Sequence, residues 1–408
     1  MVTKHRRPII TARDTEAMIL TRIGSGANLI GYYMYHGGTN PEGKLTTLQE
    51  SIPRDWCDLP IKTYDFQGAL GEYGMPHECY RALKLQHIFL KDFGASLAPT
   101  DVYFPEFNPT SPDDINNLRM SVRYKDNSGF IFVNNHQRHL DLTDKHEIEL
   151  DIELDYDNIS FPKFDLLNHE YLILPFNLKI GDSVINYATA QPLCIVNETE
   201  LLLWNFSGKC DISINEKNYK LTAGETLESD GITVILLSRA DALNTWKISD
   251  CGAGAVVRDD GIVIKEGNDF FAISCLEFTR NTISFSENMV RDNGDIFYEF
   301  KLDFNIATDS ETFLEIDYDG NIANLFLGDN LIADNFYTGL PWRVGLRRFA
   351  QKIENKKFVL QVKPLRREDD IYFEIEPKFE DGVACKLNAL KVVWERKKVA
   401  FGKVEGEL

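Results

Sequence analysis

The sequence contains no uninterrupted apolar run of about eighteen residues, the length that a membrane-spanning helix needs. It also contains no pair of cysteines in the spacing Cys-x-x-Cys, which argues against a zinc ribbon or a redox motif. The amino-terminal residues "MVTKHRRPII" are basic but lack the apolar stretch of a signal peptide. The seven cysteines are scattered and odd in number, so we expect buried free thiols.

Basic residues are fewer than acidic residues. The 408 residues include 44 Lys and Arg against 63 Asp and Glu, which gives a formal net charge of −19. Nucleic acid and anionic membrane surfaces would repel such a chain, so neither is expected as a partner. Neutral partners such as sugars fit better, and they also favour the aromatic surfaces that a 12% aromatic content can supply. The length predicts two or three globular domains.

The first hundred residues have the pattern of an α/β protein. Residues 14–25 are predicted to form a helix with Asp14 as its N-cap, and residues 76–93 form a second helix with Pro76 in its first turn. Between them, "NLIGYYMY" at residues 28–35 is a nearly continuous apolar run, typical of a strand that is covered on both faces. Helix, buried strand and helix in this order predict a parallel sheet.

After Pro99 the apolar and polar residues alternate, and turns rich in Asn, Asp and Gly recur at short intervals. This pattern predicts antiparallel β structure, in a sandwich or a barrel. We expect a proline-rich linker at residues 96–116 and a second boundary near residues 245–260. The predicted strands lie in "LRMSVRYKDNSGFIFVNN", "YLILPFNLKIGDSVINYATA", "ETELLLWNF", "ITVILLS" and "FLEIDYDGNIANLFLGDNLIADNFY".

One parallel strand with a helix on either side cannot form a domain, because two sheet edges and an apolar face would remain uncovered. Two explanations follow. Either this piece packs on the β domains in an unusual way, or the rest of its layer lies upstream of Met1.

Three ordered motifs favour the second explanation. They are "GYYMYHGGTN" at residues 31–40, "TYDFQGALGEYG" at residues 63–74 and the helix "PHECYRALKLQHIFL". Together they resemble the end of the catalytic barrel of family 35 of the glycoside hydrolases, the β-galactosidases. Segments in the β region also resemble that family's β domains: "LRMSVRYKDNSGFIFVNNHQR", "SVINYATAQPL" and "LFLGDNLIADNFYTGLPWRVGLRRF".

The resemblance implies a C-terminal fragment of a (β/α)8 TIM barrel followed by antiparallel β-sandwich or jelly-roll domains. The implied ranges are residues 1–97 for the end of the barrel, 98–250 for an antiparallel β domain and 251–408 for a jelly-roll-like sandwich. Residues 29–35 would be the eighth barrel strand, and Gly37 and Gly38 would turn the backbone at the C-terminal mouth, where active sites of this fold lie.

The implied reaction is retaining hydrolysis of terminal β-galactosides, which needs two carboxyl groups about 5–5.5 Å apart and no metal or organic cofactor. In the family these carboxylates precede the segment that this chain resembles, so we expect no catalytic residue here and no activity of the chain alone. Any export signal of the parent enzyme would also lie upstream. The alternative is a non-catalytic carbohydrate-binding or interaction protein derived from such an enzyme.

Three residues are the candidates for contact with substrate. The family pattern places Tyr33 beside the nucleophile, although it could equally be an aromatic of the barrel core. Asp65 either faces the sugar or shapes its loop through hydrogen bonds. Phe66 stands where the family commonly has a Tyr, so it can stack on a sugar ring but cannot donate a hydrogen bond. Glu72, like Asp65, is more simply a loop-bonding residue.

The loop at residues 335–346 offers a second possible sugar-binding surface. It contains Tyr337, Trp342 and Arg343, which could either bind carbohydrate or pack against the neighbouring domain.

Overall fold

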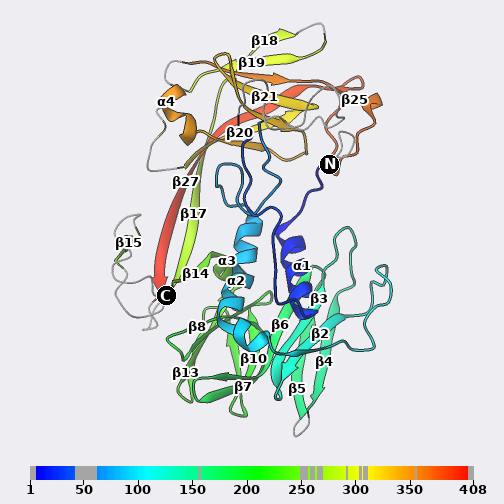
Figure 1. Ribbon diagram of the computed structural model, residues 1–408, viewed down its shortest axis with the longest axis vertical. Helices are drawn as coiled ribbons and strands as arrows, with labels where there is room; N and C mark the ends of the chain where they lie inside the picture. Colours follow the sequence, from blue (N-terminus) through cyan, green and yellow to red (C-terminus); the bar gives the residue numbers. More distant parts are fainter. Residues whose placement is uncertain are drawn as a thin grey trace. The chain divides into compact units, whose positions relative to one another are not determined.

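The computed structural model describes residues 6–41, 62–154, 158–248, 256–257, 262–263, 270–290, 293–302, 306, 311–353 and 356–402. The protein is mainly β, with 48% strand and 15% helix, and it contains several antiparallel sheets, which confirms the predicted β class (Figure 1). The chain folds into two compact units that interleave along the sequence. One comprises Met1–Ile10, Tyr33–His77 and Leu276–Lys397, and the other comprises Thr11–Tyr32, Glu78–Cys275 and Lys398–Leu408.

The two predicted helices are present in the second unit as α1 (Ala12–Gly24) and α2 (Glu78–Leu97). The expected N-cap was wrong by three positions, because Thr11 caps α1. Asp14 is the N3 residue, and its carboxylate accepts a hydrogen bond from the Thr11 backbone N–H, which completes a capping box.

Two sheets form the body of the second unit. In the seven-stranded sheet the order is β1 (Asp101–Tyr103), β2 (Arg119–Lys125), β3 (Ser128–Asn135), β6 (Glu170–Ile180), β7 (Ser183–Ala188), β10 (Lys209–Ile214) and β11 (Lys217–Thr222). In the four-stranded sheet the order is β12 (Thr226–Ser229), β13 (Ile232–Ser238), β9 (Glu200–Asn205) and β8 (Gln191–Val196). The unit also holds a hairpin of β4 (Lys145–Glu153) and β5 (Asn158–Leu166), the short helix α3 (Arg239–Asn244), and β14 (Thr245–Ile248), which pairs with the start of β17. A small pair, β15 (Val256–Val257) and β16 (Ile262–Val263), belongs here too.

Helices α1 and α2 pack on each other and on these sheets. The rings of Phe89, Phe93 and Phe130 form one aromatic cluster between α2 and β3. One pairing differs from the all-antiparallel expectation: β9 and β13 run parallel. The chain between them forms β10 to β12, which is long enough for the crossover that parallel neighbours require.

The first unit contains two facing sheets. One has the order β18 (Ser286–Val290), β19 (Ile296–Phe300), β24 (Phe358–Val362), β21 (Ile322–Leu327) and β22 (Asn330–Phe336). The other has the order β17 (Phe270–Thr282), β27 (Lys386–Gly402), β20 (Glu311–Asp319) and β23 (Trp342–Gly345). Leu325 and Leu360 of the first sheet share a buried cluster with Leu314 and Val392 of the second, so the two sheets form a sandwich. Short elements complete the unit: η1 (Arg347–Phe349), α4 (Ala350–Ile353), β25 (Leu365–Arg366), η2 (Arg367–Asp369) and β26 (Val383–Ala384).

Residues 29–35 form no strand, contrary to the expectation of a buried barrel strand. Leu29 is 91% exposed and Tyr33 is 96% exposed. Only His36, at the end of the run, makes an isolated parallel bridge, to Leu70. A strand is held by hydrogen bonds to its neighbours, and among the described residues no strand lies beside this run. The barrel fragment is therefore not seen, and the three domain ranges stay predictions.

Several other expectations can be compared with the described residues. Cys79, Cys194, Cys210 and Cys385 are free thiols, of which Cys194 and Cys210 are buried. No helix in the described part of the chain combines the length and apolarity of a membrane span. Most of the boundary predicted near residues 245–260 lies outside the described residues.

Candidate functional site

The first two sequence motifs meet in the first unit. The backbone N–H of Gly37 donates to the carbonyl of Leu70 at 2.7 Å, and that of Tyr64 donates to the carbonyl of Gly38 at 2.9 Å. Leu70 N–H in turn donates to Tyr35 O at 2.8 Å. The Gly-Gly-Thr-Asn segment and the loop that follows Thr63 therefore form one hydrogen-bonded cluster, here called the loop cluster and defined as residues 33–40 and 62–77.

The glycine pair is required by this packing. A Cβ on Gly38 would lie 2.2 Å from the ring of Tyr64, and a Cβ on Gly37 would lie 2.8 Å from the backbone of Asp65. Both distances are shorter than any van der Waals contact, and the second involves backbone that cannot rotate away. We expected these glycines to turn the backbone at the mouth of a barrel; in the structure neither has a positive φ, and close packing is what requires them.

Asp65 organises the loop cluster. Its carboxylate accepts hydrogen bonds from the backbone N–H of Gln67 at 3.1 Å and of Glu72 at 2.6 Å, and it lies 3.4 Å from Nε2 of His77. Burial alone would raise the pKa of Asp65, but His77 and these two N–H groups outweigh it and hold the pKa below its ordinary value. Asp65 is thus ionised at neutral pH and engaged on both oxygens.

The Asp65 hydrogen bonds support an unusual backbone. Phe66 has φ 58° and Gln67 has φ 53°, the left-handed region that a bulky side chain seldom adopts. Because Asp65 binds the N–H two residues ahead, it forms an Asx-type turn that stabilises this conformation. The left-handed turn determines where the Phe66 ring projects.

Arg7 joins the candidate residues, although the sequence did not single it out. Its guanidinium carbon lies 3.6 Å from the centroid of the Phe66 ring, a cation–π contact. Burial lowers the pKa of Arg7 to about 10, while the charges of Asp65 and Tyr33 act in the opposite direction. Arg7 therefore stays protonated at neutral pH and covers one face of Phe66.

Tyr33 stands apart from the other two candidates. No hydrogen bond or ring contact joins it to another residue that the structure describes, and its link to the loop cluster is electrostatic, through Arg7. Its phenol is open to solvent, so the interpretation as an aromatic of a barrel core does not describe this chain as it folds here. Tyr33, Asp65 and Phe66 are thus brought together around Arg7 and not through direct contacts.

Glu72 is the second carboxylate of the loop cluster, and it is only 5% exposed. It accepts a hydrogen bond from the Thr39 hydroxyl and lies 3.9 Å from Nη1 of Arg348. Burial raises its pKa, and the Thr39 and Arg348 contacts reduce that effect. Arg348 also donates to Thr39 Oγ1 at 2.7 Å and lies over the ring of Tyr73 at 4.4 Å.

These contacts limit the chemistry of the loop cluster. Asp65 accepts hydrogen bonds on both oxygens, and Glu72 is buried and bonded to the Thr39 hydroxyl. The described residues contain no group of His, Cys, Asp and Glu side chains arranged to hold a metal ion. What remains for a ligand is an exposed phenol at Tyr33, a guanidinium at Arg7 and the half-buried ring of Phe66.

The alternative binding surface near the C-terminal sandwich is not available. Tyr337 and Trp342 belong to the buried core of that sandwich. Arg343 lies 3.3 Å from a Glu315 carboxylate oxygen and 3.1 Å from one of Glu395. The structure places both rings in the core of their own sandwich, whereas we expected them to meet either a sugar or a neighbouring domain.

No protein-family model matches this chain.

Proposed function

We propose that this chain is the C-terminal part of a glycoside hydrolase of the β-galactosidase type, related to family 35. In this proposal residues 1–97 complete a (β/α)8 barrel, and the sandwich of the first unit is a jelly-roll domain. The reaction is retaining hydrolysis of terminal β-galactosides, and its two carboxylates are supplied by chain outside these 408 residues.

One observation carries the proposal: motifs separated by about thirty residues converge in a single hydrogen-bonded cluster. The Gly-Gly pair, the Asp65 turn and His77 at the entrance to the second helix all contribute to it. At the mouth of a barrel, loops that follow different strands meet in this way.

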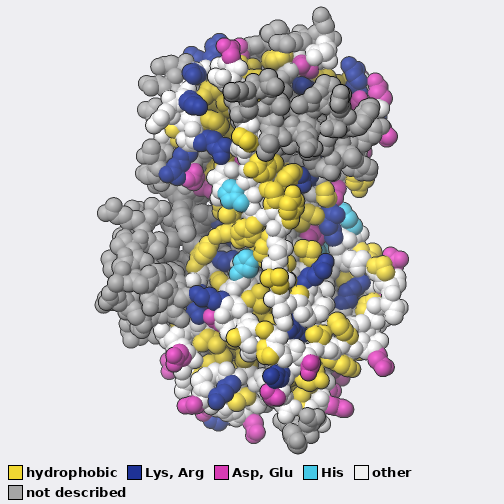
Figure 2. Space-filling view, in the orientation of Figure 1, with side chains coloured by type: hydrophobic (Ala, Val, Ile, Leu, Met, Phe, Trp, Pro, Cys, Tyr) yellow, Lys and Arg dark blue, Asp and Glu magenta, His cyan; other side chains and the backbone are white. Residues whose placement is uncertain are grey.

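The exposed apolar residues support the same proposal. Leu29 and Met18 of the second unit are exposed, and Figure 2 shows hydrophobic side chains gathered over the part of the view where Figure 1 draws α1 and α2. Tyr33 of the first unit is exposed as well. A soluble chain seldom leaves such residues uncovered unless they meet another surface. The neighbouring elements of a barrel would cover them.

The proposal assigns a role to each candidate. Tyr33 donates a hydrogen bond to a catalytic carboxylate or to the sugar, and Phe66 stacks on the sugar through the face that Arg7 leaves free. Asp65 is a positioning residue, because its oxygens are used to hold the turn that carries Phe66. Catalytic residues proper are absent from this set.

The test compares two proteins with an aryl β-galactoside as substrate. We expect no turnover by the 408-residue chain, and turnover by a longer chain that includes the segment encoded directly upstream. In the longer chain Tyr33→Phe should lower kcat/KM by about tenfold or more, the effect of losing one hydrogen bond to a charged group. Turnover by the short chain, or a longer chain without a pair of essential Glu residues, would contradict the proposal.

A non-catalytic carbohydrate-binding protein is the second candidate, and the occupied state of Asp65 and Glu72 favours it. The same comparison separates the two. A longer chain that binds galactosides but does not cleave them supports the binding protein.

A further inference from the structure

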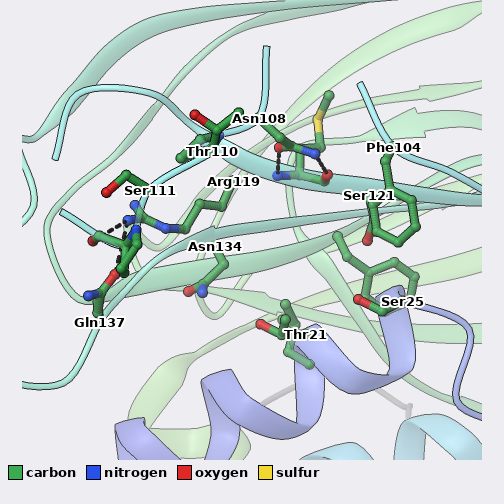
Figure 3. A pocket seen from close by; sticks show the side chains of 15 residues that line it. Thr21, Ser25, Phe104, Asn108, Thr110, Ser111, Arg119, Ser121, Asn134 and Gln137 are labelled. Atoms are coloured by element: carbon green, nitrogen blue, oxygen red, sulfur yellow. Dashed lines mark hydrogen bonds between the residues drawn. The ribbon is translucent and has the colours of Figure 1, made fainter. Parts of the chain in front are cut away.

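A pocket of about 430 Å³ lies within the second unit, whereas the loop cluster belongs to the first. Its walls are the last turn of α1, the loop after β1 and the neighbouring strands β2 and β3 (Figure 3). The volume falls within the range of about 300–1,000 Å³ that is typical of small-molecule sites. None of the sequence motifs pointed to it.

The loop that closes the pocket is held in place. The side-chain amide of Asn108 donates to Met120 O at 2.7 Å and accepts from Met120 N–H at 2.8 Å, as a strand neighbour would. Nη2 of Arg119 donates to Asp114 O at 2.9 Å and to Gln137 Oε1 at 3.0 Å. These contacts fasten the loop to β2 at two points, Asn108 and Asp114.

Three of the hydroxyl groups that line the pocket belong to Thr21, Ser25 and Ser121 and are not used elsewhere. Thr21 lies in α1 and Ser25 is the C-cap of that helix, one turn further on, and in Figure 3 their side chains rise from the helix on the side of the strands. Ser121 lies on β2, opposite Phe132 of β3. None of the three hydroxyls makes a hydrogen bond to another described residue, and each can both donate and accept.

Two aromatic rings also line the pocket. Phe104 lines the pocket with 54% of its surface exposed, and Phe132 lines it from a buried position. The face of an aromatic ring carries partial negative charge, so it attracts the C–H groups on the apolar face of a sugar. Apolar rings combined with a few polar groups are the usual lining of a ligand site.

The charges of the lining residues limit which ligands the pocket can bind. No carboxylate lines the pocket, which disfavours cations and metal ions. Arg119 is the one charged lining residue, and its Nη1 is buried with no hydrogen-bond partner among the described residues. An unpaired buried donor is costly, so an oxygen acceptor beside it is favoured. The net charge of −19 would oppose an anionic ligand in this part of the chain as elsewhere.

We infer that this pocket binds a neutral sugar ring, with Phe104 stacked on its apolar face and Thr21, Ser25 and Ser121 bound to its hydroxyl groups. Arg119 donates to a ring or hydroxyl oxygen. This site is independent of the loop cluster and of the proposed hydrolase activity.

The test is saturation-transfer NMR and titration of the full 408-residue chain with D-galactose, D-glucose and D-mannose, and with D-glucuronate as the anionic comparison. We expect at least one neutral sugar to bind. Phe104→Ala should weaken that binding by about fivefold to tenfold, and Thr21→Val by about threefold to tenfold.

The matched control is Phe107→Ala. Phe107 lies in the same loop and is 52% exposed, but it does not line the pocket, so the affinity should not change. Thermal melting of each variant checks that the fold is retained, and Phe104 is exposed enough for its loss to be tolerated. Because the readout is binding, failure of the galactosidase assay leaves this test intact.

Three results would overturn the inference. They are no binding of any neutral sugar, equal effects of Phe104→Ala and Phe107→Ala, or binding of glucuronate alone. A loss of sugar binding in Tyr33→Ala but not in Phe104→Ala would also overturn it, because the bound sugar would then lie in the loop cluster.

Discussion

The guanidinium of Arg123 donates a hydrogen bond from Nη2 to the backbone carbonyl of Leu97 at 2.9 Å. Its Nη1 donates to the carbonyl of Ile23 at 3.1 Å, and the whole residue is buried. Leu97 is the last residue of α2, and Ile23 lies in the last turn of α1. One side chain of β2 therefore binds carbonyl groups at the C-terminal ends of both helices, where these carbonyls also accept from the N–H groups of Gly26 and Thr100.

We predict that Arg123→Met lowers the free energy of unfolding of the second unit by about 2–4 kcal/mol, because it removes the hydrogen bonds of a buried guanidinium to the ends of both helices. Hydrogen exchange in denaturant, read at the amides of α1 and α2, measures the change. Arg22→Met is the control, since Arg22 lies in the last turn of α1 but is exposed. Equal effects of the two substitutions would contradict this role for Arg123.

We predict that Gly38→Ala destabilises the loop cluster by about 1–3 kcal/mol, because its Cβ would overlap the ring of Tyr64. Limited proteolysis at residues 62–77 should become faster. Gly31→Ala is the matched control, since no atom lies within 4 Å of its Cβ position. The double variant with Tyr64→Ala should lose less than the sum of the two single changes, and simple additivity would argue against the overlap.

Asp92 and Lys247 form a buried ion pair, with Oδ1 and Nζ 2.8 Å apart and side chains 10% and 7% exposed. Asp92 Oδ2 also accepts the N–H of Ile195 at 2.8 Å. We expect Asp92→Asn to destabilise the second unit by about 3–5 kcal/mol, because a buried ammonium loses its counter-charge. Urea unfolding followed by circular dichroism provides the measurement.

A control for this change is Glu149→Gln, which removes an exposed ion pair with Lys163 in the same unit. It should cost no more than about 1 kcal/mol. If Asp92→Asn costs as little, the burial of the pair does not govern its contribution.

Protonation of His136 should make the stability of the second unit depend on pH. Its Nε2 lies 2.9 Å from Asp14 Oδ1 and its Nδ1 lies 3.1 Å from Nδ1 of His169. Burial lowers the pKa of His136, with His169 and Arg13 acting in the same direction and Asp14 opposing them. The folded protein thus resists protonation of His136, and the unfolded chain takes up that proton first as the pH falls.

Stability should therefore be lost as the pH falls through about 6.5, the ordinary pKa of histidine. The pKa of Asp14 is also lowered in the fold, which adds a further loss below about pH 4. Thermal melting between pH 7.5 and pH 5 should show a smaller slope for His136→Gln than for the unchanged chain. His146→Gln, at an exposed position, should leave the slope as it is, and a slope unaffected by either variant would exclude His136 as its source.

Much of the secondary structure could be predicted because it depends on local pattern. The helical period in residues 12–24 and 78–97 and the alternation in strands such as β2, β3 and β13 are readable over a few positions. The cap of α1 was misplaced because Thr11 and Asp14 are both good caps, and only the reciprocal bonds decide between them. The parallel pairing of β9 and β13 could not be read from alternation, which is the same in either orientation.

Only part of the candidate site could be predicted from the sequence. The loop-shaping role of Asp65 follows from residue type and neighbours, and the geometry agrees with it, whereas the close packing at Gly37 and Gly38 depends on Tyr64 and Asp65 and was not predicted. Arg7 and Arg348 were missed because they reach the loop cluster from distant parts of the chain. An isolated arginine in a sequence carries no sign of the ring or carboxylate that it will meet.

By itself, the amino-acid sequence determined the β class and the two helices, since each rests on composition or on neighbours a few positions apart. Tertiary structure alone decided that residues 29–35 are not a strand, that Glu72 is buried, and that a pocket opens between α1 and β2. The physical reason is that pairing, burial and cavities depend on which distant segments meet, and a strand or a pocket wall exists only when its partner is present.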